Sequence, residues 1–128
     1  MNLDFFKQTR ILDGGMGQEL LARGMKPNGT LWSANALLKE EYHQLLLDTH
    51  LDFIKSGAEI IVTTTFTTRR LRLRDNKIED KFEYLNKKAG EIAQKAKEQY
   101  PNVLIAGGLP PQYLTYEEDT RPDDEIKQ

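Results

Sequence analysis

The segment from Glu59 to Phe66 reads EIIVTTTF, a nearly continuous run of apolar and β-branched residues. A run of this kind predicts a β-strand that is covered on both faces, as the strands of parallel sheets are. Two shorter apolar segments, Ile11–Asp13 and Val103–Ala106, lead into glycine-rich turns and also predict strands. Such strands are stable only where other elements cover both faces of their sheet.

Helical patterns separate the three predicted strands. A helix is predicted over about Glu40–Lys55, where apolar residues gather on one face. A second helix is predicted over about Ile78–Tyr100, where apolar residues recur at three- and four-residue spacing. A shorter helical segment, Gln18–Arg23, stops at Gly24. Strands that alternate with helices predict βαβ units, so the fold class is α/β with parallel strands.

The predicted elements are too few for a finished parallel α/β fold. The pattern gives about three βα units, and Arg121–Glu125 resembles only the first turn of a further helix. The sheet would lack cover on one face. We therefore expect residues 1–128 to be part of a larger fold.

Composition excludes several classes of function. The 128 residues carry a net charge of −2, which gives no general attraction to nucleic acid or to anionic membranes. No apolar run approaches the roughly 20 residues of a membrane helix, and no secretory signal is visible, so a cytoplasmic location is expected. The chain has no cysteine, which excludes disulfides, thiolate metal ligands and a cysteine nucleophile.

Polar or glycine-rich residues follow each predicted strand at its C-terminal end. They are Asp13–Gly15, Thr63–Phe66 and Gly107–Gly108. In parallel α/β folds these ends share one edge of the sheet, where binding sites assemble. Asp13 is therefore a candidate site residue, although a role as turn-former or helix cap is equally compatible with the sequence.

Two other patterns do not predict binding sites. The glycines of the first turn miss the dinucleotide spacing, because Leu20 stands three positions after Gly17. The arginines of the segment 69–76 have no interleaved aromatic residues, and acidic residues follow them. This basic segment is expected to be a solvated or ion-paired connector.

The two histidines cannot bind one metal ion together. His43 and His50 lie seven positions apart on the predicted helix, about 10 Å along its axis. Two ligands of one zinc ion lie within roughly 4 Å of each other. His50 is expected to be packed or hydrogen-bonded as a structural residue, and His43 to be solvated.

Several motifs occur in the order of a known family. They are Ile11–Leu20 (ILDGGMGQEL), Arg23–Gly24, Leu31–Ala34 (LWSA), His50–Phe53 (HLDF), Ser56–Ile61 (SGAEII), Thr63–Phe66 (TTTF) and Ile105–Gly108 (IAGG). Together they resemble the opening of homocysteine S-methyltransferases, including betaine–homocysteine methyltransferase and the homocysteine module of cobalamin-dependent methionine synthase. The resemblance covers nearly the whole chain.

The resemblance implies a (β/α)₈ TIM barrel, of which residues 1–128 would be the incomplete N-terminal segment. It implies transfer of a methyl group from an activated donor to the thiol of homocysteine, giving methionine. Zinc would bind the substrate sulfur and favour the thiolate. The family's zinc ligands are cysteines of later strands, and this chain has none. The chain alone is therefore expected to be inactive.

The resemblance also assigns substrate-binding residues. Asp13 and Gly14 match residues that contact homocysteine at the end of the first strand. Thr63 and Phe66 match residues that hold its carboxylate end, and Trp32 is a looser candidate for the pocket wall. No position matches a catalytic or metal-binding residue. The expected partners are thus homocysteine and a methyl donor, both small molecules, with neither nucleic acid nor membrane. The alternative is a non-catalytic half-barrel that binds or assembles as a homo-oligomer.

Overall fold

The structure is a computed structural model that describes residues 2–111. Its helices and strands are α1 (Met16–Ala22), α2 (Asn35–Leu38), α3 (His43–Lys55), β1 (Ile60–Val62), α4 (Arg70–Asp75), α5 (Phe82–Gln99) and β2 (Leu104–Ala106). Four short 3₁₀ helices accompany them: η1 (Leu3–Lys7), η2 (Trp32–Ala34), η3 (Glu40–Tyr42) and η4 (Glu79–Lys81). The helix start predicted at residues 121–125 lies outside the described residues.

The strands are parallel, as the sequence predicted. β1 pairs with β2 so that Ile61 faces Ile105. On the other side of β1, Leu12 forms a single parallel bridge to Ile60, and the N–H of Asp13 donates to the Ile60 carbonyl at 3.0 Å. The described chain therefore contains three parallel segments side by side, and the first is reduced to one bridge.

The central strand is shorter than the predicted segment 59–66. β1 ends at Val62, because the chain turns at the following threonines: the N–H of Thr65 donates to the Thr63 carbonyl at 2.8 Å. The N–H of Thr63 still donates to Ala106 in β2 at 2.9 Å. Hydrogen bonds of the threonine hydroxyls stabilise this turn, and the backbone hydrogen bonds of the strand do not continue beyond it. The prediction of a strand through Phe66 was therefore wrong.

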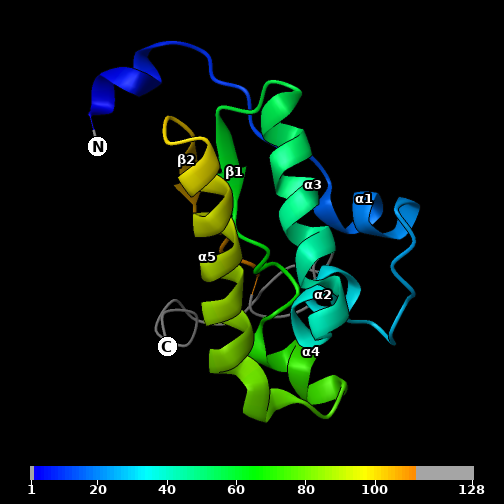
Figure 1. Ribbon diagram of the computed structural model, residues 1–128. Coiled ribbons are helices and arrows are strands. Elements are labelled where there is room, and N and C mark those ends of the chain that lie inside the picture. The colour runs from blue at the N-terminus through cyan, green and yellow to red at the C-terminus, as the bar shows by residue number, and fades with distance from the viewer. Residues whose placement is uncertain (1, 112–128) are drawn as a thin grey trace, which may run out of the picture.

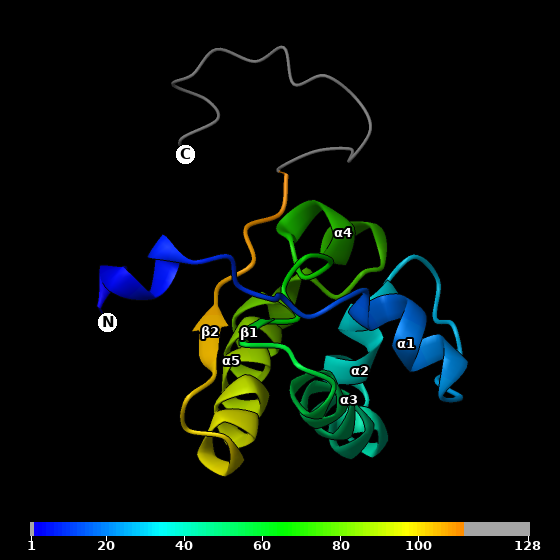
Figure 2. The same ribbon diagram turned by 90° about the horizontal axis from the view of Figure 1, so that it is seen from above.

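The two long helices, α3 and α5, lie side by side on the same side of the strands (Figures 1 and 2). Both were predicted, and each is preceded by a 3₁₀ turn, η3 or η4. The inward face of α5 carries small residues, among them Ala89, Ala93 and Ala96, which let α3 and the strands approach closely. Ala93 and Ala96 pack with Leu51 of α3 and Ile61 of β1 in one buried hydrophobic cluster.

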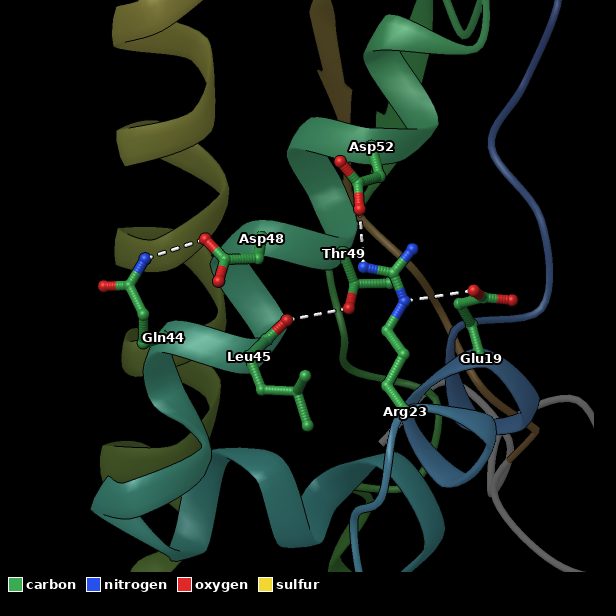
Figure 3. Close-up of polar contacts among 7 residues, drawn as sticks. All are labelled: Glu19, Arg23, Gln44, Leu45, Asp48, Thr49 and Asp52. Atoms are coloured by element: carbon green, nitrogen blue, oxygen red, sulfur yellow. Dashed lines mark hydrogen bonds and ion pairs between the residues drawn. The ribbon is translucent and has the colours of Figure 1, made fainter.

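An arginine joins α1 to α3. The Nε of Arg23 lies 3.0 Å from Oε1 of Glu19, and its Nη1 lies 2.6 Å from Oδ2 of Asp52 (Figure 3). Exposed pairs of this kind contribute up to about 1 kcal/mol each. They orient α1, whose first turn follows the Asp13–Gly15 segment.

The basic segment 69–76 agrees only in part with the expected solvated or ion-paired connector. Most of it forms the short helix α4, and Arg74 pairs with Glu79 at 2.9 Å, as an ion-paired connector would. Arg69 is instead buried, with 6% of its surface exposed. The tertiary fold overrides the tendency of arginine to lie at the surface.

Within residues 2–111, no helix is long and apolar enough to cross a bilayer.

Candidate functional site

Asp13 lies at the tip of the central strand. Its Oδ2 accepts a hydrogen bond from the backbone N–H of Val62, the last residue of β1, at 2.9 Å. The N-terminus of α1 has Gly15 as its cap residue and no side-chain cap hydrogen bond, so Asp13 is not a helix cap. The half-buried carboxylate is fixed at the strand end with its second oxygen, Oδ1, accepting no bond from another residue in the described part of the chain.

Burial and hydrogen bonding act in opposite directions on Asp13. Desolvation is the larger effect and raises the pKa of the carboxyl above its ordinary value. Hydrogen bonds from the Val62 N–H and from its own backbone N–H favour the ionised form and limit the rise. A desolvated carboxylate with a free oxygen gains from a cationic partner, because the charge is poorly screened there.

Gly14 follows Asp13 where the chain passes close to α3. A Cβ at this position would lie 3.0 Å from Cε1 of Phe53, tighter than ordinary van der Waals contact. Glycine therefore allows the first strand end to pass over the Phe53 ring, and it keeps the space beside Asp13 free of a side chain.

A threonine–glycine network ties the end of β1 to the end of β2. The N–H of Gly108 donates to Oγ1 of Thr63 at 3.1 Å, and Oγ1 of Thr65 donates to the Gly108 carbonyl at 2.7 Å. The two hydroxyls lie 3.1 Å apart. The Thr63 side chain is thus engaged within the protein. Thr65 was not predicted as a site residue, because the sequence of a threonine run does not indicate which hydroxyl will form a hydrogen bond to the next strand.

Phe66 and Trp32 are half-exposed aromatic residues. The exposed fraction is 48% for Phe66 and 49% for Trp32. Trp32 has a φ of +50°, a left-handed conformation that is strained for a tryptophan. The residues that follow each aromatic are joined, because Oγ1 of Thr67 lies 3.3 Å from the Ser33 hydroxyl. The segment carrying Trp32 is therefore anchored to the turn after β1.

A cavity of about 360 Å³ lies beside this turn. It is bounded by the turn after β1, the start of α5 and the segment after β2. The residues that line it include Thr65, Thr68, Arg69, Arg70, Asn86 and Gly108. Sequence patterns did not reveal this cavity, because its walls come from three separate segments.

Arg69 has an unusual environment in the wall of that cavity. Its guanidinium carbon lies 5.7 Å from the centre of the Phe66 ring. Its buried Nε and Nη1 have no hydrogen-bond partner in the described structure. Desolvation lowers the pKa of Arg69, with a smaller contribution from the nearby Arg72, but arginine remains charged at neutral pH.

A second cavity, of about 440 Å³, lies at the opposite end of the strands. Phe5, Glu59, Tyr100 and Val103 are among the residues that line it. These residues precede or begin the strands. Because sites of parallel α/β barrels form at the C-terminal ends of strands, this second cavity is the weaker candidate for a substrate site.

The histidines do not form a metal site. His50 is fully buried, as a packed structural residue would be, and neither ring nitrogen has a hydrogen-bond partner in the described structure. Burial lowers its pKa to about 4. The expectation that His43 is solvated was wrong, because it is partly buried and its Nε2 lies 2.7 Å from the Leu37 carbonyl. Among residues 2–111, no three His, Cys, Asp or Glu side chains are grouped closely enough to hold a metal ion.

Sequence comparisons connect the chain to methyltransferases. The family model for homocysteine S-methyltransferase matches residues 10–128. Homocysteine S-methyltransferase of Escherichia coli is 31% identical over 109 residues, which are 79% of this chain and 34% of that protein. Selenocysteine methyltransferase of Astragalus bisulcatus is 33% identical over 101 residues, 76% of this chain and 29% of that protein. The chain thus spans about a third of the length of these relatives.

Structural comparison gives the same relationship. The metallated form of the Escherichia coli homocysteine methyltransferase MmuM superimposes with a TM-score of 0.70 and 32% identity. The match covers 84% of this chain and 40% of that one. The parallel strands and helices of this chain therefore correspond to part of a TIM barrel, as predicted. The chain belongs to the homocysteine S-methyltransferase family.

Proposed function

We propose that this chain is the N-terminal, homocysteine-binding segment of a homocysteine S-methyltransferase, which transfers a methyl group from an activated donor to the homocysteine thiol and so forms methionine. The observation that carries the proposal is the Asp13 carboxylate, fixed at the tip of β1 by the Val62 N–H. Family membership supports the proposed reaction, and the geometry of the strand ends supports the proposed substrate-binding role.

Asp13 is suited to the ammonium group of an amino acid. One of its oxygens is held at 2.9 Å from the Val62 nitrogen, which fixes the carboxylate direction. The other has no partner from another described residue and is free to accept from a ligand. A charge-assisted hydrogen bond to an ammonium would offset the desolvation of this half-buried carboxylate. Gly14 leaves space beside it for the ligand.

The turn after β1 is suited to the substrate's carboxylate. The backbone N–H of Phe66 donates to no other residue in the described part of the chain. Thr63 contributes by holding Gly108 and so fixing the turn, since its hydroxyl already accepts the Gly108 N–H. We propose that Phe66 binds the carboxylate through its backbone and that Thr63 positions the turn. Trp32 would form an outer wall.

The residues of this chain do not fit the zinc ion that the family resemblance implies. The chain has no cysteine, and residues 2–111 contain no cluster of three metal-binding side chains. The substrate-binding residues proposed above therefore orient homocysteine, and they cannot hold the metal ion that would activate its sulfur. We expect this chain alone to bind homocysteine without methylating it. A cytoplasmic location and a place in methionine synthesis remain predictions from the sequence.

Isothermal titration calorimetry with L-homocysteine tests the proposal. Wild-type protein should bind, and Asp13→Asn should bind roughly tenfold or more weakly, because it loses the charge but keeps an oxygen for Val62. Asp48→Asn is a matched control, since that exposed carboxylate accepts a hydrogen bond from Gln44 of the same helix, α3. Equal binding by wild type and Asp13→Asn would contradict the proposed role.

One observation favours the alternative of an assembly module. Ile11 and Leu12, in the outermost strand segment, are 59% and 56% exposed. An apolar strand edge of this kind favours association with another chain. Sedimentation velocity separates the two cases: a dimer that dissociates when Leu12 is changed to Lys supports assembly through this edge, whereas a monomer at all concentrations excludes it.

A further inference from the structure

Trp32 has a backbone conformation that a tryptophan does not favour. Its φ of +50° lies in the left-handed region. The residue belongs to a turn that closes where the Ala34 N–H donates to the Leu31 carbonyl at 3.0 Å. A left-handed residue directly after the first position of a turn is ordinarily glycine, asparagine or aspartate. A strained residue of another type persists only where neighbouring groups hold it, so the groups that hold Trp32 need to be identified.

Thr67, in the turn after β1, holds the segment that carries Trp32. Its Oγ1 accepts a second hydrogen bond from the Ala34 N–H at 3.0 Å, and it lies 3.3 Å from the Ser33 hydroxyl. Thr67 and Ser33 are both buried, so water competes little for these contacts. In the described part of the chain, no other side chain is hydrogen-bonded to residues 31–34. One oxygen atom therefore connects both residues that follow Trp32 to the turn after β1.

The ring of Trp32 also lies beside the start of α1. A Cβ on Gly17 would lie 3.7 Å from Cε3 of this ring, at ordinary van der Waals distance. Gly17 follows the Asp13–Gly15 segment, in which Asp13 is the proposed ligand for the substrate ammonium group. Trp32 is therefore placed between the end of the first strand segment, through its ring, and the turn after β1, through its backbone.

We propose that Thr67 is a positioning residue for the homocysteine pocket, because its hydroxyl holds Trp32 in the left-handed conformation and so orients the outer wall. Thr67 directly follows Phe66, whose backbone N–H is the proposed donor to the substrate carboxylate. Its hydrogen bonds thus connect the wall to the carboxylate-binding group, and a wall arranged in advance lowers the cost of binding. The importance of this wall for homocysteine rests on the proposed function, whereas the contact between Thr67 and the Trp32 segment does not.

Fluorescence of the ligand-free chain tests whether Thr67 holds Trp32. The signal reports this residue alone, because the chain has a single tryptophan. Thr67→Val keeps nearly the same side-chain shape but removes the oxygen. Trp32 should then leave the strained conformation and its contact with α1, so quenching by acrylamide should increase. Thr67→Ser keeps the hydroxyl and should restore the wild-type quenching. Each variant is measured at a temperature at which circular dichroism shows it to be folded.

Thr49→Val is the matched control for loss of a buried hydroxyl. Thr49 is fully buried, and its Oγ1 donates to the Leu45 carbonyl within α3 at 2.7 Å (Figure 3). This substitution should lower the melting temperature without changing the quenching of Trp32. A merely structural role of Thr67 would give the same result in Thr67→Val, and that result would overturn the proposal.

Ser33→Ala provides a second variant if Thr67→Val does not fold. It removes one of the two contacts of Thr67 and leaves the bond from the Ala34 N–H. A smaller increase in the quenching of Trp32 is expected. Quenching that is unchanged in Ser33→Ala, or that stays high in Thr67→Ser, would overturn the positioning role as well.

Calorimetry with L-homocysteine separates the positioning role from the proposed function. Thr67→Val should bind roughly threefold or more weakly than the wild type, whereas Thr67→Ser and Thr49→Val should bind as the wild type does. Increased quenching in Thr67→Val with unchanged affinity would overturn the role of Thr67 in the pocket. A wild-type chain that does not bind homocysteine would contradict the proposed function, and the quenching results would then decide alone whether Thr67 holds Trp32.

Discussion

The backbone N–H of Val62 donates to the carboxylate of Asp13 at 2.9 Å, although the two residues lie 49 positions apart. This bond joins the first strand segment to the end of β1 in the same place where Thr63 joins β1 to β2. The ends of three parallel segments are therefore held together by side chains of their own tip residues. A ligand at this edge meets a preorganised surface, which lowers the cost of binding.

The hydrogen bond from the Val62 N–H to Asp13 stabilises the fold, and two substitutions of Asp13 test how much the acceptor oxygen contributes. Asp13→Ala leaves a partly buried N–H without a partner and should lower the free energy of unfolding by about 1–3 kcal/mol. Asp13→Asn should cost less than Asp13→Ala, because its side-chain oxygen still accepts from Val62. Urea denaturation measures both. Equal destabilisation by the two substitutions would show that the acceptor oxygen does not matter.

The link between β1 and β2 depends on close approach at Gly108. A Cβ there would lie 3.0 Å from Oγ1 of Thr65 and 3.3 Å from the Thr63 carbonyl. We predict that Gly108→Ala lowers the free energy of unfolding by about 1–2 kcal/mol and that Thr65→Val costs about 1 kcal/mol. Gly107→Ala is the matched control, because a Cβ at that position meets nothing within 4 Å. If Gly107→Ala is as damaging as Gly108→Ala, local backbone effects explain the loss.

His50 makes stability depend on pH. Burial lowers its pKa from 6.5 to about 4, so the unfolded chain binds the proton more readily than the folded chain between these values. The contribution of His50 to the free energy of unfolding is therefore fully present above about pH 6.5, and it is lost as the pH falls toward 4. We expect a loss of about 2 kcal/mol between about pH 7.5 and pH 5 from this group.

Urea denaturation at the two pH values measures the contribution of His50. His50→Leu should abolish most of the difference, whereas His43→Gln, which replaces the partly exposed histidine, should retain it. A pH dependence that is the same in His50→Leu and in the wild type would contradict the assignment.

Trp32 offers an optical signal for the site, since it is the single tryptophan of the chain. Its ring is half exposed, and its segment is anchored to the turn after β1 through Ser33 and Thr67. If Trp32 forms an outer wall of the pocket, L-homocysteine should change its emission in a saturable way. The change should be weakened in Asp13→Asn by the same factor as the binding itself. An unchanged emission in a sample that binds homocysteine would remove Trp32 from the site.

The sequence predicts the elements of this fold better than their ends. The helices α3 and α5 follow from periodic apolar patterns, and the parallel strands follow from short continuous apolar runs; both signals are local. The early end of β1 was not predicted, because Thr63 and Thr65 have high strand propensity and leave the ladder only when their hydroxyls bond across to Gly108. Tertiary contacts decide such boundaries.

The candidate site was predictable in its residue types and less so in its geometry. Asp13 was marked by its position after an apolar segment, but its partner Val62 depends on the register between strands far apart in sequence. The burial of Arg69 had no signal, since an arginine among other arginines normally indicates a solvated surface. His43 was expected to be solvated, whereas its Nε2 lies 2.7 Å from the carbonyl of Leu37, six residues earlier.

The most direct test of the central claim is amide chemical-shift mapping by NMR with L-homocysteine added to the uniformly ¹⁵N-labelled chain. We predict that the largest changes occur at the strand ends, at Gly14, Thr63 and Phe66, and that Asp13→Asn needs roughly tenfold or more L-homocysteine to produce them. Changes confined to residues around the opposite cavity, such as Tyr100 and Val103, or no changes at all, would contradict a homocysteine site at the C-terminal ends of the strands.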